Sequence, residues 1–85
     1  MSWEVVVDTG AQKQLKRISK TDTERIRAVL REFAVNPYAG DIRKMEGEDD
    51  VWRRRIGAYR ILYEVRTKPR TIYVFDIHRR TSSTY

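Results

Sequence analysis

Apolar positions at the start of the chain follow the spacing of one short strand and one helix. Residues 2–7 contain a tryptophan and a run of valines, a composition that predicts a β-strand. Asp8 or Thr9 then offers a side-chain oxygen that can cap the start of a helix. In that helix the apolar residues fall at i, i+4 and i+7 and form one core-facing stripe: they are Ala11, Leu15 and Ile18.

A second helix is predicted almost directly after the first. Thr21 and Glu24 have the spacing of a capping box and indicate its start. Its buried stripe consists of Ile26, Val29, Leu30 and Phe33. Asn36-Pro37 ends it, because the residue before a proline avoids helical backbone angles. So short a connection predicts that the two helices form an antiparallel hairpin.

The second half of the chain changes to the alternating pattern of strands. The predicted strands cover residues 42–45, 51–56, 59–66 and 71–77. Turns are expected at residues 47–50, 57–58 and 68–70, and residues 81–85 form a tail. The strand at 71–77 is the most apolar and is expected to be central.

These elements predict a fold of the α+β class with the order β-α-α-β-β-β. An N-terminal strand and a helical hairpin would pack on an antiparallel-rich sheet. Because 85 residues support one modest core, we expect residues 1–85 to form a single domain.

The hairpin around Gly57-Ala58 carries the clearest candidate chemistry. A two-residue turn would place Arg55 opposite Arg60 and Arg53 opposite Leu62. Since side chains alternate between the faces of a strand, all three arginines would then share one face. The other face would carry the apolar and aromatic residues together with Arg54: Trp52, Ile56, Tyr59, Ile61 and Tyr63.

Two interpretations of these arginines are open. Like charges directly opposite each other destabilise a sheet, so stability alone does not explain why Arg55 faces Arg60. An anionic ligand would remove the conflict, because guanidinium groups offer paired donors that match a phosphate. Alternatively, long arginines cover apolar surface while their charges stay in water. We favour the phosphate interpretation for Arg53, Arg55 and Arg60, and the structural one for Arg54.

Charge is distributed unevenly and supports a polyanionic partner. Residues 1–50 carry 9 basic and 10 acidic side chains, whereas residues 51–85 carry 9 basic and only 2 acidic ones. A local positive field of this kind attracts nucleic acid and speeds the encounter. A surface that merely keeps the protein soluble would look similar.

Several classes of function are not supported. Cysteine is absent, so disulfides and thiolate chemistry are excluded. We expect no metal and no cofactor, because Glu46, Glu48, Asp49 and Asp50 are typical of a solvated acidic turn. No apolar run approaches the roughly 20 residues that a membrane span requires, and no signal peptide is predicted. We therefore expect a cytoplasmic protein without a membrane partner.

Further candidates lie near the C-terminus. Arg79 and Arg80 could add phosphate contacts, and Tyr85 could stack on a base, as aromatic rings do in RNA sites. His78 is a candidate acid or base, although a lone histidine is more often structural. A last residue is also often frayed.

Three segments resemble the RelE/ParE toxin superfamily. Lys44-Met45-Glu46-Gly47 is similar to the family's Lys-Leu-x-Gly. The long segment Trp52–Val65 is similar to its aromatic-Arg-x-Arg-Val-Gly-Asp-Tyr-Arg-Val-Ile-Tyr strand pair and is the most specific of the three. Ile77-His78-Arg79-Arg80 with Tyr85 is similar to its closing His-Arg and final tyrosine.

The resemblance implies a RelE-like toxin of a type II toxin–antitoxin system. Such a toxin is a metal-independent endoribonuclease that cleaves mRNA in the ribosomal A site. The 2′-hydroxyl attacks the adjacent phosphate and a 2′,3′-cyclic phosphate is left. The implied partners are the ribosome, mRNA and a cognate antitoxin, with which the toxin forms a hetero-oligomer.

The resemblance also implies roles for individual residues. Arg60 would hold the scissile phosphate, Arg79 would help the leaving oxygen, and Tyr85 would position the substrate. The implied contacts to the RNA are Arg53, Arg55, Lys44 and Arg80. One departure concerns the proton acceptor, because Val51 stands where relatives carry a lysine. His78 and Tyr85 are the remaining candidates for that role.

Two other functions stay open. The protein could be a non-catalytic inhibitor of DNA gyrase, as in the ParE branch, although that branch generally lacks the basic trio and the closing tyrosine. It could also be a non-toxic binding module that retains the toxin fold.

Overall fold

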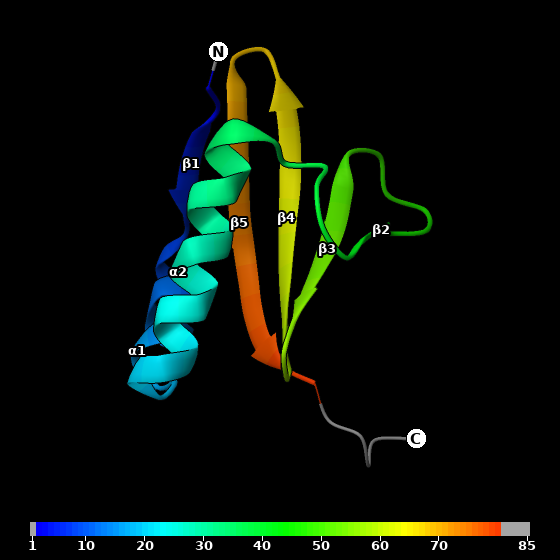
Figure 1. The fold of residues 1–85 in the computed structure, drawn as a ribbon. Coiled ribbons are helices and arrows are strands. Elements are labelled where there is room, and N and C mark those ends of the chain that lie inside the picture. The colour runs from blue at the N-terminus through cyan, green and yellow to red at the C-terminus, as the bar shows by residue number, and fades with distance from the viewer. Residues whose placement is uncertain (1, 81–85) are drawn as a thin grey trace.

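The computed structural model describes residues 2–80 and consists of one five-stranded sheet with two helices on one of its faces (Figure 1). The elements, in chain order, are β1 Glu4–Val7, α1 Thr9–Lys16, α2 Lys20–Val35, β2 Ile42–Lys44, β3 Val51–Ile56, β4 Tyr59–Thr67 and β5 Arg70–Arg79. The α+β class is therefore confirmed, as is the predicted succession of a strand, two helices and further strands. The observed order is β-α-α-β-β-β-β, because the short strand β2 precedes β3, β4 and β5. No helix among residues 2–80 covers the second face of the sheet, and we call it the open face.

The strands lie side by side in the order β1-β5-β4-β3-β2. β1 runs parallel to β5, and the other neighbouring strands are antiparallel. The C-terminal strand is interior, as its apolar character predicted, but β4 and not β5 is the middle strand. Its pairing with β1 makes β5 interior, and β4, β3 and β2 follow on its other side, which places β4 in the middle.

Both helices begin at side-chain caps. Asp8 caps α1 by accepting a hydrogen bond from the Ala11 backbone N–H at 2.8 Å. The predicted start of α2 at Thr21 is wrong, because Ser19 is the cap and accepts from the backbone N–H of Asp22. Asn36 caps the C-terminus of α2 directly before Pro37, as predicted. The helices run in opposite directions (Figure 1).

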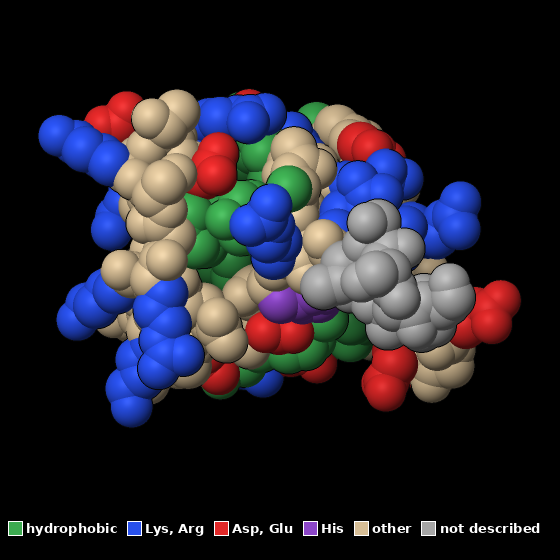
Figure 2. All heavy atoms as spheres, turned by 90° about the horizontal axis from the view of Figure 1, so that it is seen from below, with side chains coloured by type: hydrophobic (Ala, Val, Ile, Leu, Met, Phe, Trp, Pro, Cys, Tyr) green, Lys and Arg blue, Asp and Glu red, His purple; other side chains and the backbone are tan. Residues whose placement is uncertain are grey.

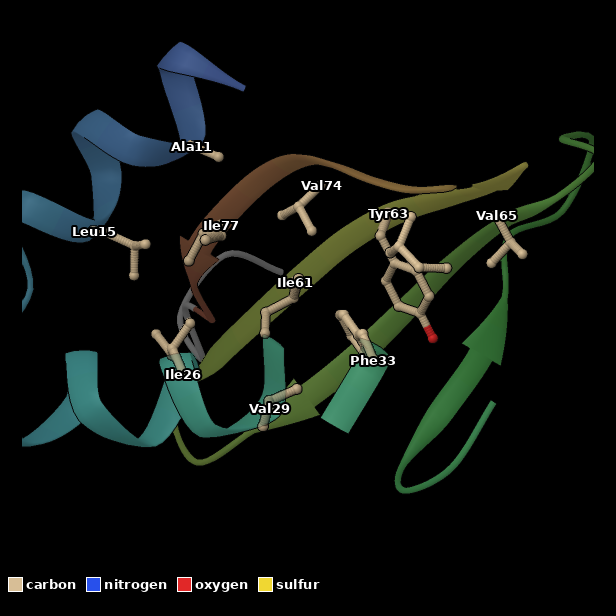
Figure 3. Packing of buried hydrophobic residues seen from close by; sticks show 11 residues of the cluster. Ala11, Leu15, Ile26, Val29, Phe33, Ile61, Tyr63, Val65, Val74 and Ile77 are labelled. Atoms are coloured by element: carbon tan, nitrogen blue, oxygen red, sulfur yellow. The ribbon is translucent and has the colours of Figure 1, made fainter. Parts of the chain in front are cut away.

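The hydrophobic core lies between the helices and the covered face of the sheet (Figure 3). Phe33 of α2 packs on Tyr63 of β4 with 4.3 Å between the ring centroids. The hydroxyl of Tyr63 donates a hydrogen bond of 2.7 Å to the backbone oxygen of Pro37. This bond satisfies the one polar atom of the Tyr63 side chain and ties the end of α2 to the centre of the sheet.

The register of the β3–β4 hairpin agrees with the predicted one. Ile56 pairs with Tyr59, Arg55 with Arg60, and Arg53 with Leu62. Ile61 and Tyr63 of β4 are fully buried beneath the helices. Since neighbouring residues alternate between faces, Arg60 and Leu62 lie on the open face.

β4 and β5 contain one irregularity that also shapes the open face. Leu62 pairs with Asp76, whereas Tyr63 pairs with Val74, so Phe75 is an additional residue without a partner in β4. A bulge of this kind changes the direction in which a side chain points. Phe75 accordingly lies beside Leu62 and Val51 rather than in the core.

Candidate nucleic-acid interface

Four arginines from three strands lie together on the open face. Arg53 and Arg55 of β3 alternate with residues that face the helices, and Arg60 of β4 lies directly opposite Arg55. Arg43 of β2 lies directly opposite Arg53 and extends the group toward the sheet edge. We call Arg43, Arg53, Arg55 and Arg60 the arginine cluster. Sequence reasoning did not find Arg43, because the pairing of β2 with β3 decides its face.

The charges of the arginine cluster are close enough to perturb one another. Burial lowers the pKa of the Arg53 guanidinium below its ordinary value, and the positive charges of Arg60, Arg43 and Arg55 lower it further. The carboxylate of Asp41 acts in the opposite direction and raises it. Arg53 is therefore the centre of a group of like charges that repel one another, and an anion between them would relieve the repulsion.

Hydrogen-bonding capacity in this region is also unused. The Nε atoms of Arg53, Arg55 and Arg60 are buried and have no hydrogen-bond partner among residues 2–80. A buried donor without a partner is costly, so such atoms are expected where a ligand supplies the acceptor. Phosphate oxygens are the acceptors that match this geometry best.

The carboxylate nearest to the arginine cluster does not neutralise it. Asp41 Oδ2 lies 3.8 Å from Arg55 Nε, which is longer than a hydrogen bond. The Asp41 side chain is 70% exposed, so solvent screens this ion pair. The cluster therefore keeps most of its charge available for a partner.

Arg54 has a different environment from its neighbours in β3. Its terminal nitrogen lies 3.3 Å from Glu32 Oε1 of α2 and 3.3 Å from the backbone oxygen of Ala39. Only 12% of its side chain is exposed. Its guanidinium also lies against Gly40, where a Cβ atom would come within 2.4 Å of the Arg54 side chain. Arg54 is thus a structural residue on the helix-covered face, although its Nε, too, has no partner in the described chain.

His78 and Asp76 of β5 form a pair on the open face beside the arginine cluster. His78 lies directly opposite Arg60, and Asp76 lies opposite Leu62. His78 Nδ1 is 3.0 Å from Asp76 Oδ2, and both side chains are partly exposed. If Nδ1 carries the hydrogen, the imidazole keeps Nε2 as an acceptor. Asp76 was not among the residues singled out from the sequence, because the bulge at Phe75 sets its face.

The two C-terminal arginines point in different directions. Arg79 pairs with Tyr59. Ile77, two residues earlier in β5, is buried under the helices, so alternation places Arg79 on the same, helix-covered side. Arg80 continues the alternation of Asp76 and His78 toward the open face, and its backbone N–H donates to Ala58 at 2.6 Å. Its Nε is buried without a partner among residues 2–80, like those of Arg53, Arg55 and Arg60.

Two other predicted site residues do not join the arginine cluster in the described chain. Lys44 pairs with Trp52, which places its side chain on the helix-covered side at the edge of the sheet. Tyr85 lies outside the described residues.

Basic side chains gather around the end of the molecule that carries the Gly57-Ala58 turn. Figure 2 looks at this end and shows lysine and arginine side chains on both the helix side and the sheet side. The field of the protein thus extends beyond the arginine cluster, and it favours the approach of a polyanion from this direction.

Among residues 2–80, no three histidine, aspartate or glutamate side chains are grouped so that they could hold a metal ion. No helix within the same residues is both long and apolar enough to cross a membrane.

The sequence matches a family whose model is described as ParE toxin of type II toxin-antitoxin system, parDE, over residues 5–83. RelE1 of Methanocaldococcus jannaschii is 29% identical over 83 residues, which cover 94% of this chain and 92% of that protein.

Solved structures of the same fold include toxins with and without their partners. The archaeal RelE–RelB complex from Pyrococcus horikoshii has 27% identity and a TM-score of 0.76, covering 98% of this chain and 100% of that chain. The isolated RelE toxin of Escherichia coli has 20% identity and a TM-score of 0.85, covering 98% of this chain and 89% of that one.

Proposed function

Because this chain belongs to the ParE toxin family of type II toxin–antitoxin systems, we propose that it is a ribosome-dependent endoribonuclease. Its substrate would be mRNA in the ribosomal A site. The observation that carries this proposal is the arginine cluster, which gathers four guanidinium groups on the open face, three of them with an unused Nε donor among residues 2–80. A protein with this function would work in the cytoplasm.

The arginine cluster would act on the charge that develops during cleavage. The 2′-hydroxyl oxygen of the RNA attacks the adjacent phosphorus, and the bond from phosphorus to the 5′-oxygen breaks. The products are a 2′,3′-cyclic phosphate and a 5′-hydroxyl. Negative charge on the phosphorane oxygens peaks in the transition state, where preplaced donors are most effective. Arg60 would hold the scissile phosphate, while Arg53 and Arg55 would bind the flanking backbone.

His78 would be the proton acceptor in this scheme. The residue at position 51 is a valine and cannot take a proton. His78 lies opposite Arg60, and its Nδ1 is held by Asp76 at 3.0 Å. The hydroxyl proton would pass to Nε2, while an arginine or water protonates the leaving 5′-oxygen. Both Arg79, from the family resemblance, and Arg80, from its direction, are proposed for contacts near that oxygen, and Tyr85 is proposed to stack on the substrate.

We further propose that a cognate antitoxin binds and inactivates the protein in a hetero-oligomer. Several solved relatives with this fold are complexes of RelE with RelB. Co-expression of the adjacent reading frame should restore growth and yield a stable complex. We expect neither a metal nor a cofactor to be needed for cleavage.

Expression in cells followed by mapping of mRNA ends tests the nuclease proposal. We expect growth arrest and new mRNA ends at fixed positions within codons, and we expect Arg60→Ala to abolish both. Arg31→Ala is a matched control, since Arg31 is an exposed arginine of α2 outside the site.

One observation favours a second candidate function. The matching family is described by the name ParE, and the ParE branch includes inhibitors of DNA gyrase. DNA breakage with intact mRNA would support that function and contradict the nuclease. Expression without growth arrest would instead support a non-toxic binding module.

A further inference from the structure

A hollow on the open face lies next to the arginine cluster and has no role in the chemistry above. It is lined by Met45, Glu46, Glu48, Val51, Leu62 and Phe75. Its volume is about 380 Å³, within the range of roughly 300–1,000 Å³ that small-molecule sites occupy. The hollow combines an apolar floor with two carboxylates at its rim.

The position of the hollow connects it with the proposed cleavage site. Leu62 in its floor lies directly opposite Arg53 on β3 and directly opposite Asp76 on β5. Residues in such pairs have Cβ atoms about 4.5–5.5 Å apart. A nucleotide whose phosphate contacts Arg53 would therefore have this hollow within reach of its base.

The lining of the hollow suits a flat heterocycle. The bulge in β5 places the ring of Phe75 beside Leu62 and Val51, and aromatic rings are the usual stacking partners of RNA bases. Glu46 and Glu48 are exposed and come from the β2–β3 connection. Ionised carboxylates accept hydrogen bonds but cannot donate them, and they repel phosphate. The part of a ligand that meets them must therefore present N–H groups.

We infer that this hollow binds one base of the RNA and selects guanine. The Watson–Crick edge of guanine presents N1–H and N2–H side by side, which matches the two oxygens of a carboxylate. Uracil presents two carbonyl acceptors around a single N–H, and these would face the carboxylates unfavourably. The inference deepens the proposed function and rests on it: the arginine cluster binds the backbone, and Glu46 and Glu48 read the adjacent base.

Binding of short RNA oligonucleotides that differ only in one base tests this selectivity. The ligands are RNA trimers that carry guanine, adenine, cytosine or uracil at each position in turn. Fluorescence anisotropy measures the affinity of the intact protein for each trimer. We expect a preference of about tenfold for guanine over uracil at one position, since a good paired contact to a base edge discriminates by about that factor or more.

Variants of the rim and the floor separate base selection by the two carboxylates from stacking on Phe75. Glu46→Gln combined with Glu48→Gln should reduce the preference to less than about threefold and leave binding of the uracil trimer unchanged or stronger. Phe75→Leu should weaken all trimers alike, because stacking tolerates any base. Asp49→Asn is the matched control, as Asp49 belongs to the same connection but does not line this hollow.

The outcomes distinguish this inference from the proposed function. Two outcomes would overturn the inference and leave the nuclease proposal intact. One is cleavage of mRNA without a base preference, and the other is a guanine preference that survives in the Glu46/Glu48 double variant. Absence of both RNA binding and cleavage would overturn both. A urea unfolding curve for each variant shows whether a loss of binding reflects a loss of folded protein.

Discussion

Arg53 and Arg54 are consecutive residues of β3 whose guanidinium groups lie on opposite faces of the sheet. Arg54 is bound to Glu32 and to the backbone of Ala39 beneath the end of α2. Arg53 lies among Arg43, Arg55 and Arg60 on the open face, with a buried Nε that has no partner in the described chain. Two identical side chains in sequence therefore have separable roles, one in folding and one in the proposed site.

Substituting each of the two arginines should separate stability from activity. Arg54→Ala should lower the free energy of unfolding by about 1–2 kcal/mol, mostly through the lost bond to Ala39 and lost packing, since the half-exposed Glu32 contributes little. Arg53→Ala should leave stability within about 0.5 kcal/mol and strongly reduce RNA cleavage. Urea unfolding and a cleavage assay per folded molecule measure the two effects. Equal losses of cleavage in both variants would contradict this separation.

The salt dependence of RNA binding should report the number of arginine contacts. For single strands, each phosphate contact contributes about 0.7 to the slope of log K against log salt concentration. Arg55→Ala should reduce that slope by about 0.7, whereas Arg31→Ala should not change it, because Arg31 is an exposed arginine of α2 away from the arginine cluster. Asp41→Asn should strengthen binding, because it removes the carboxylate 3.8 Å from Arg55. An unchanged slope for Arg55→Ala would mean that Arg55 does not contact the backbone.

The hairpin was the part of the site most accessible to sequence reasoning. The two-residue turn at Gly57-Ala58 fixes the register, and alternation then fixes the face of every arginine in β3 and β4. Arg53, Arg55 and Arg60 could be grouped on this basis alone. No other part of the site depends on so short a loop.

The remaining parts depend on long-range pairing or irregular backbone. The face of Arg43 follows from the pairing of β2 with β3 across a longer connection, which no turn rule determines. Asp76 and Phe75 take their positions from the bulge in β5, which alternation does not reveal. At the start of α2, Ser19 and Thr21 each precede an acidic residue at the capping-box distance, so the spacing alone did not distinguish them, and Ser19 is the cap. The parallel pairing of β1 with β5 likewise joins residues far apart in the sequence, which no local pattern determines.

The contributions of Arg79 and Arg80 to the cleavage rate can be compared directly. Family resemblance points to Arg79, whereas strand alternation directs Arg80 toward the arginine cluster and leaves its Nε buried without a partner in residues 2–80. We expect Arg80→Ala to reduce the single-turnover cleavage rate more than Arg79→Ala does. The reverse order would contradict the assignment by strand alternation and would support Arg79 as the residue that contacts the leaving oxygen.

The hydroxyl of Tyr63 should contribute to the free energy of unfolding. Tyr63→Phe leaves the buried Pro37 oxygen without its donor, which should cost about 1–2 kcal/mol and lower Tm by about 4–8 °C per kcal/mol. Tyr73→Phe is the matched control, because its longer bond of 3.3 Å to Asp8 is only partly buried. We expect that control to lose less than about 0.5 kcal/mol.

Burial also raises the pKa of Tyr63 above its ordinary value, which is about 10. Because the folded state holds this proton more tightly than the unfolded state, the associated stability is fully present below pH 10 and is lost as pH rises further. Stability should thus fall more steeply above about pH 10 in the wild type than in Tyr63→Phe. Parallel curves for the two proteins would contradict the buried phenol as the cause.

His78 and Asp76 should behave as a proton acceptor and its positioning residue. His78→Ala should lower the maximal cleavage rate by about 10²–10⁴ with little change in RNA affinity, because it removes the proposed base and not a phosphate contact. Asp76→Asn should cause a smaller loss, about tenfold, since the imidazole remains but its orientation is less well supported.

Chemical rescue distinguishes these roles from a purely structural one. Added imidazole should restore part of the activity of His78→Ala, because a free base can enter the vacated space, and should have no effect on Asp76→Asn. The measurement is the single-turnover rate on ribosome-bound mRNA at saturating toxin, so that affinity does not enter the comparison. If His78→Ala cleaves at the wild-type rate, the proton acceptor lies elsewhere, and Tyr85 becomes the residue to test next.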